Sequence, residues 1–189
     1  MTNERPISIP YLDGNLTGSV ALVPHPAAVV LIANDHGCSR HDPAERVLLD
    51  GLCRRGFATV LVDLIMPAEA GAPEQAAFVR TDTAELARRI RAARSFVEGI
   101  PGLATLPLVL FGQGAGADAA LLSATARPAG IASVIVRGSR DGSKLRLASV
   151  RAPVLVCAEK SPEACARSVS AWIRAELLPR ARQAAVAAV

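Results

Sequence analysis

Residues 108–121 read LVLFGQGAGADAAL, and they give the clearest single indication of the fold. Its first part, residues 108–111, is a short continuous apolar run, which is typical of a strand buried on both faces. A turn with three glycines follows, and residues 115–126 then form an apolar run long enough for a short helix. Because glycines let a strand and a helix approach closely through a tight turn, the stretch predicts a strand, a sharp turn and a helix.

Strand and helix patterns alternate on both sides of this stretch. Further strands are expected at residues 28–33, 58–64, 131–136 and 154–158, and further helices at residues 43–55, 82–98 and 162–178. The segment 67–73 is rich in Pro, Ala and Gly and is interpreted as a loop. This alternation implies right-handed crossovers and a mostly parallel sheet of about five strands, covered by helices on both sides.

The two ends of the chain depart from this pattern. Residues 7–11 and 16–23 predict short strands, and the turn residues between them favour an antiparallel hairpin within residues 1–24. Residues 181–189 form an Ala-rich tail with no assigned role. Since neither a repeat nor a second domain is evident, residues 1–189 are expected to form a single domain.

Composition restricts the class of protein. The chain is 51% hydrophobic and 20% charged, which provides enough apolar surface for a core and argues against disorder. No apolar run reaches the roughly 18 residues that a membrane helix needs, and the first residues lack the pattern of a secretory signal. We therefore expect a cytoplasmic protein that contacts no membrane.

The charge pattern does not point to nucleic acid. The net charge is +4, and five arginines fall in one stretch with a helical pattern: Arg80, Arg88, Arg89, Arg91 and Arg94. Nucleic-acid surfaces interleave such charges with aromatic residues, whereas the whole chain has 1 Trp, 1 Tyr and 4 Phe. We interpret the arginines as a solvated helix face and expect no nucleic-acid partner.

The four cysteines give no sign of a metal or redox centre. Cys38, Cys53, Cys157 and Cys165 contain no closely spaced CxxC pair, the usual feature of zinc clamps and redox dithiols. We expect buried free thiols, no metal and no cofactor.

Several segments together resemble a known family. Residues 36–43 read HGCSRHDP, residues 56–59 read GFAT, residues 62–64 read VDL, residues 112–116 read GQGAG and residues 152–156 read APVLV. They resemble the dienelactone-hydrolase-like group of α/β-hydrolases, whose members read HGSGSSRHSP after the third strand and GASTG at the strand-turn-helix called the nucleophile elbow. The resemblance covers most of the chain. It implies a three-layer α/β sandwich with a mostly parallel sheet and an N-terminal hairpin, here with a shortened C-terminal end.

The catalytic residues of that family do not carry over. The position of the serine or cysteine nucleophile falls on Gly114, which has no side chain to form an acyl intermediate. The family's acid falls near Glu159, a loose match, and its C-terminal histidine has no counterpart, because the histidines here are His25, His36 and His41. Without nucleophile and base, at best weak residual catalysis is expected, so we predict an inactive or nearly inactive hydrolase homologue.

A binding site could persist without the triad. In the resembled family the loop after the third strand supplies an oxyanion-hole amide, a role that would fall on Gly37 and Cys38 opposite the amide of Ala115. Together with Gln113 and Gly114, these residues would form a small pocket for an anionic ligand at the start of a helix.

Other interpretations of the same residues stay open. Cys38 with His36 or His41 could form a thiolate-imidazole pair and make the chain an active esterase or dienelactone-type hydrolase. His36 and His41 could bind a metal together with Asp35 or Asp42, a weaker alternative.

Two further alternatives do not depend on hydrolase chemistry. The glycine-rich turn could hold a dinucleotide, although its spacing departs from GxGxxG. The chain could also be an interaction module, because the missing last strand would leave a sheet edge open to a second copy and so to a homodimer.

Overall fold

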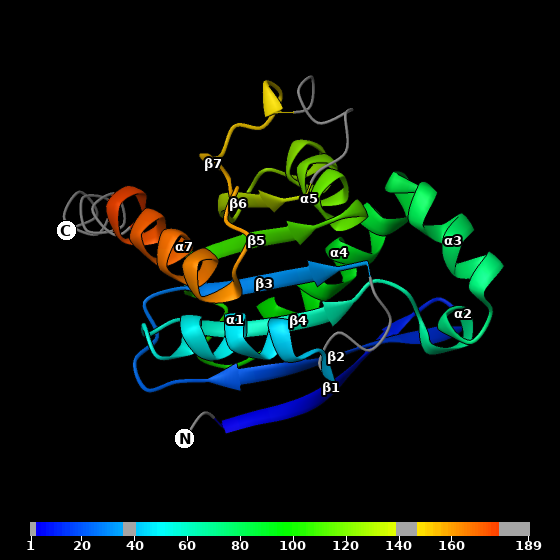
Figure 1. The fold of residues 1–189 in the computed structure, drawn as a ribbon, viewed down its shortest axis with the longest axis horizontal. Helices are drawn as coiled ribbons and strands as arrows, with labels where there is room; N and C mark the ends of the chain where they lie inside the picture. The colour runs from blue at the N-terminus through cyan, green and yellow to red at the C-terminus, as the bar shows by residue number, and fades with distance from the viewer. Residues whose placement is uncertain (1–2, 36–40, 139–146, 178–189) are drawn as a thin grey trace.

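The computed structural model describes residues 3–35, 41–138 and 147–177 (Figure 1). The strands are β1 (Asn3–Tyr11), β2 (Gly14–Leu22), β3 (Val29–Asn34), β4 (Ala58–Asp63), β5 (Leu108–Gln113), β6 (Ile131–Arg137) and β7 (Val154–Val156). The helices are α1 (Pro43–Cys53), α2 (Pro67–Ala70), α3 (Pro73–Thr81), α4 (Thr83–Glu98), α5 (Ala115–Ala126) and α7 (Pro162–Glu176). The Ala-rich tail at residues 181–189 lies outside the described residues.

The strands form one 7-stranded sheet in the order β1-β2-β4-β3-β5-β6-β7. β1 and β2 make an antiparallel hairpin, and β2 is antiparallel to β4. The remaining strands, from β4 across to β7, are all parallel to one another. The predicted mostly parallel sheet with an N-terminal hairpin is confirmed.

Both faces of this sheet are covered. Figure 1 shows α1 and α7 in front of the sheet and α4 behind it. Alternate residues of each parallel strand pack into the two layers, as the pleat of a strand requires. Leu31, Val60 and Leu110 join the core under α4 and α5, whereas Ile32, Leu61 and Phe111 join the core under α1 and α7. This is the expected three-layer sandwich.

Side chains at three helix starts fix where those helices begin. Asp42 is the N-cap residue of α1, and its carboxylate accepts a hydrogen bond from the amide of Ala44 at 2.7 Å. Asp82 caps α4 in the same way, and Ser161 caps α7. Each cap satisfies an amide that would otherwise lack a helical partner.

The predicted loop at residues 67–73 is wrong. The structure forms the short helix α2 there, and α3 begins at Pro73. Both helices carry Pro at their first position, where its fixed backbone angle and missing amide suit a helix start. Figure 1 shows α2 and α3 beyond the end of the sheet toward which β3, β4 and β5 point, the edge called here the carboxyl edge.

The arginine-rich stretch is not one solvated face. It is divided between α3 and α4, and Arg89 and Arg94 are buried. Arg89 forms a two-pronged ion pair with Glu69 of α2, with both N···O distances at 2.6 Å, and also donates to the carbonyl oxygen of Leu64 at 2.7 Å. Burial alone would raise the pKa of the Glu69 carboxyl, but hydrogen bonds from Arg89 and the Met66 amide outweigh burial and lower that pKa.

The sheet ends at β7 within the described residues. β7 is a short edge strand, and Val156 is 60% exposed. The expected shortened C-terminal end and the homodimer through this edge both stay predictions. None of the helices in the described part of the chain is long and apolar enough to cross a membrane.

Candidate functional site: the glycine elbow and Asp35

The turn between β5 and α5 has the backbone geometry of a nucleophile elbow. Gly114 has φ +56° and ψ −125°, a conformation that side chains rarely adopt, and α5 begins at the next residue, Ala115. The Gly114 amide donates to the carbonyl oxygen of Arg137 at 3.0 Å, which ties the turn to the end of β6. The sharp turn is therefore present, and glycine at position 114 adopts it without strain.

Close packing beside the turn explains a second glycine. A Cβ atom at Gly116 would lie 2.5 Å from the backbone oxygen of Ala33 in β3. Only glycine lets α5 pass this near to the central strand. The first turn of α5 is thereby held against the carboxyl edge between β3 and β5.

Asp35 packs against the position from which a side chain on residue 114 would project. Asp35 directly follows β3 and is 6% exposed. Its Oδ2 accepts a hydrogen bond from the amide of Ala115 at 3.0 Å. A Cβ atom at Gly114 would lie 2.7 Å from the same Oδ2. The Asp35 carboxyl group therefore contacts both the Cβ position of residue 114 and the first amide of α5.

The Ala115 amide is the group that matters for acyl-transfer chemistry. In a nucleophile elbow, the amide of the residue after the nucleophile is one donor of the oxyanion hole. It is also one of the unpaired amides at a helix start, where the helix dipole favours negative charge. The Asp35 carboxyl accepts the hydrogen bond of this amide and lies at the start of the helix, so the amide already has an acceptor within the chain.

α3 contributes to holding Asp35 in place. The Arg80 Nε atom donates to the backbone oxygen of Asp35 at 2.9 Å. Arg80 belongs to α3, a helix that the sequence pattern did not predict, so the pattern gives no sign that Arg80 contacts Asp35.

A polar network extends from the elbow on the side of α1 and α7. The Gln113 Nε2 donates to Glu45 at 2.8 Å, and the Gln113 Oε1 accepts from Arg137 at 3.2 Å. Arg137 also donates to the carbonyl oxygen of Lys160 at 2.9 Å. The network joins α1, β5, β6 and the loop after β7, so Gln113 has structural partners.

The predicted site residues are only partly brought together. Gln113, Gly114 and Ala115 form the elbow, whereas His36, Gly37 and Cys38 lie outside the described residues. Their predicted roles, in the oxyanion hole, as a thiolate-imidazole pair or as metal ligands, therefore stay predictions.

The acid candidate Glu159 and the described histidines lie outside the elbow. Glu159 is exposed, and its Oε1 accepts from the Ser168 hydroxyl of α7 at 3.0 Å. His41 is exposed just before α1. His25 lies in the loop that leads into β3, at the opposite end of the strands from the elbow.

The sequence pattern gives Asp35 only a weak role as a metal ligand and does not predict its contact with the elbow. The one sequence feature that indicates this contact is the position of Asp35 directly after β3, because β3 is the neighbour of β5 in the sheet. No group of three metal-ligating residues occurs among the residues that the structure describes.

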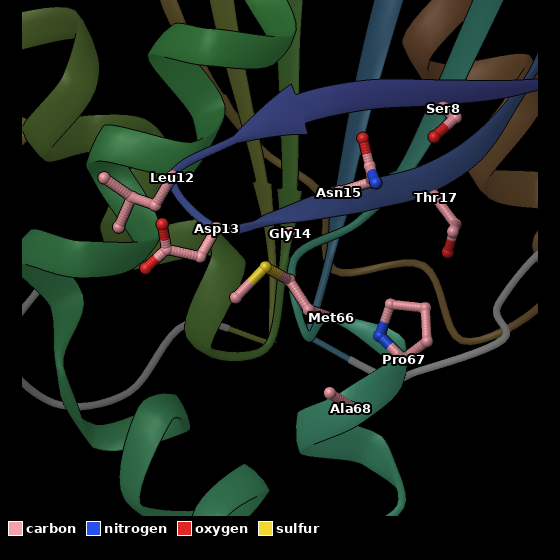
Figure 2. Close-up of a pocket in the computed structure, with 9 residues that line it drawn as sticks. All are labelled: Ser8, Leu12, Asp13, Gly14, Asn15, Thr17, Met66, Pro67 and Ala68. Atoms are coloured by element: carbon pink, nitrogen blue, oxygen red, sulfur yellow. The ribbon is translucent and has the colours of Figure 1, made fainter.

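A pocket of about 530 Å³ lies elsewhere on the carboxyl edge, between the hairpin turn and the start of α2 (Figure 2). Its lining is Ser8, Leu12, Asp13, Gly14, Asn15, Thr17, Met66, Pro67 and Ala68. It contains none of the elbow residues, because β4 and β3 lie between β2 and β5 in the sheet. A small-molecule ligand of this chain stays a prediction.

Comparison with solved structures establishes the fold. A dienelactone hydrolase from Anabaena variabilis superposes with a TM-score of 0.77 and 22% identity, over 93% of this chain and 99% of that chain. The chain has the α/β-hydrolase fold. A thermostable carboxyl esterase from Bacillus coagulans also matches this α/β-hydrolase fold, with a TM-score of 0.54 and 19% identity over 71% of this chain and 44% of that chain.

Sequence comparison gives a different kind of relative. A Mycobacterium tuberculosis protein named "Putative phosphoribosyl transferase" is 33% identical over 142 residues. The match covers 75% of this α/β-hydrolase-fold chain, which spans only 31% of the relative. No protein-family model matches the chain.

Proposed function

We propose that this chain is a non-catalytic α/β-hydrolase-fold domain resembling the dienelactone hydrolases, with an elbow closed by its own Asp35. The observation that carries the proposal is the 3.0 Å hydrogen bond from the Ala115 amide to the Asp35 carboxyl, beside a nucleophile position that is glycine.

Two requirements of ester hydrolysis are missing at this elbow. Acyl transfer needs a nucleophilic side chain, which Gly114 lacks. It also needs amide donors free to stabilise the negative oxygen that develops on the substrate carbonyl. Asp35 uses the Ala115 amide and places a carboxyl group where that negative charge would form.

The small-anion site expected from the sequence is, in this proposal, filled from inside the protein. An external anion competes with the Asp35 carboxyl for the Ala115 amide and for the start of α5. The wild-type chain therefore binds small anions weakly at the elbow, and Asp35 has a structural role similar to that of a helix cap.

The direct test is hydrolysis of p-nitrophenyl acetate by the wild-type chain, Cys38→Ala and Gly114→Ser, each with the blank rate subtracted. We expect no turnover by the wild-type chain or Cys38→Ala. We expect none by Gly114→Ser either, because Asp35 blocks the new hydroxyl. Wild-type turnover that disappears in Cys38→Ala would contradict the proposal and support the alternative of an active esterase that uses Cys38.

The curated relative supports a second candidate, an accessory domain that acts beside a phosphoribosyl transferase. The shared region makes up 31% of that relative, and in this chain it has a hydrolase fold. On this proposal, the remaining part of the relative carries the transferase activity. The chain alone should then consume no phosphoribosyl diphosphate donor in the presence of nucleobases, and consumption by the chain alone would contradict the accessory role.

A further inference from the structure

Two buried cysteines meet where β7 joins α7. The Sγ atoms of Cys157 and Cys165 lie 3.0 Å apart, and both thiols are free. Cys157 is 5% exposed and Cys165 is fully buried. The sequence predicted buried free thiols at these positions, but the pattern gave no sign that the two would touch.

The local fold brings these sulfurs together. Cys157 extends the edge of the sheet just past β7, since its amide donates to the carbonyl oxygen of Val136 at 2.8 Å. The chain then reverses, and Ser161 caps α7, which places Cys165 in its first turn facing the sheet. The pair therefore links the last strand of the described sheet to the helix that covers it.

We propose that Cys157 and Cys165 are a redox-modification site, at which a peroxide converts the two thiols to a reversible disulfide. One sulfur, as thiolate, attacks a peroxide oxygen to give a sulfenic acid and releases water after proton transfer. The second sulfur then attacks the sulfenic sulfur and releases a second water. Two electrons pass from the cysteines to one molecule of hydrogen peroxide, and two thiol protons end in water.

Burial sets the rate of this step. Burial raises the pKa of the Cys165 thiol, and its contact with Cys157 raises that pKa further, so little thiolate is present at neutral pH. Oxidation therefore requires local opening at the three-residue strand β7. We expect oxidation over hours, in contrast to the fast response of an exposed sensor cysteine.

The disulfide would restrict the loop after β7, which lies between the two cysteines. That loop contains Lys160, whose carbonyl oxygen accepts from Arg137, and Arg137 in turn contacts Gln113 at the elbow. Closing the short loop between the cysteines would fix the start of α7 to the edge of the sheet beside this network.

The chain provides a matched control cysteine for the test. Cys53 is also buried and free, but its sulfur faces the Thr59 hydroxyl at 3.5 Å and has no thiol neighbour among the described residues. The full chain is first reduced, then treated with hydrogen peroxide, alkylated and digested. Peptide mass spectrometry should find the Cys157–Cys165 cross-link, lighter by two hydrogen atoms and reversed by dithiothreitol.

Variants test whether the cross-link affects the fold. Oxidised wild type and oxidised Cys53→Ser should melt roughly 5–10 °C above their reduced forms, whereas Cys157→Ser should show no such shift. Peptide mapping of the wild type needs no variant, so a poorly folded Cys157→Ser leaves the proposal testable. Recovery of both Cys157 and Cys165 as alkylated thiols, or a cross-link to Cys53 or Cys38 instead, would overturn the proposal.

Discussion

The Asp35 carboxyl lies in close contact with the point where a side chain at position 114 would begin. Its Oδ2 is 2.7 Å from the ideal Cβ position of Gly114 and 3.0 Å from the amide nitrogen of Ala115. Glycine at 114 and aspartate at 35 are therefore sterically linked, because a larger residue at 114 requires the Asp35 carboxyl to move and to give up its hydrogen bond to the Ala115 amide. In the proposed function, this relationship gives the elbow a structural role.

The steric dependence predicts that Gly114→Ser is more costly than backbone strain alone. Gly102→Ser is the matched control, since Gly102 also has a positive φ of +84° but has no atom within 4 Å of its ideal Cβ position. Both variants should lose about 1–3 kcal/mol of unfolding free energy through strain. Gly114→Ser should lose more, as measured by urea unfolding.

A double variant isolates the contact with Asp35. Asp35→Ala should recover part of the loss in Gly114→Ser and none of the loss in Gly102→Ser, with a coupling free energy of about 0.5–3 kcal/mol. Strictly additive effects of Asp35→Ala and Gly114→Ser would contradict the steric relationship.

The buried pair of Glu69 and Arg89 predicts a large cost on its removal. Glu69→Gln should reduce the unfolding free energy by about 3 kcal/mol, because it leaves a buried guanidinium with less compensating charge. Glu4→Gln is the comparison, since its partner Arg46 is 44% exposed. It should cost less than about 1 kcal/mol. Equal losses in the two variants would argue that α2 is not anchored through Glu69.

The same pair predicts a dependence of stability on pH. The folded-state pKa of Glu69 lies below its ordinary value of 4.5, as hydrogen bonds from Arg89 and the Met66 amide outweigh burial. Its contribution to stability is therefore present above that value and is lost as the pH falls through the folded-state pKa. Urea unfolding at a series of pH values from about 7 down to about 2 should show a smaller loss of stability on acidification in Glu69→Gln than in the wild type. If Glu69→Gln loses as much unfolding free energy at low pH as the wild type, the loss arises from other carboxyl groups.

Much of the sheet could be predicted from the sequence because its strands are continuous apolar runs between clear turn residues. The helix at 115–126 was predicted with the bounds that α5 has. The segment at residues 67–73 misled the prediction, because Pro, Ala and Gly suggest a loop while each proline in fact begins a helix. Tertiary contacts such as the pairing of Glu69 with Arg89 decide that outcome, and no local pattern contains them.

The candidate site could be predicted only in part, for a similar reason. The sharp turn at Gly114 is local, and the glycine spacing predicted it. The contact of Asp35 with Ala115 joins residues far apart in the chain and depends on β3 and β5 being neighbours. The burial of Arg89 could not be predicted either, since an arginine-rich helix is ordinarily solvated and only the fold places this one beside α2.

The most direct test of the central claim measures whether Asp35 occupies an anion site. Inorganic phosphate is titrated into the wild type, Asp35→Ala and Asp13→Ala, and the melting temperature is followed. Asp13→Ala removes the same charge from the exposed hairpin turn. Phosphate at about ten times its dissociation constant should raise the melting temperature of Asp35→Ala by roughly 3–6 °C and leave the other two proteins almost unchanged. Equal stabilisation of all three proteins, or none of Asp35→Ala, would contradict the account.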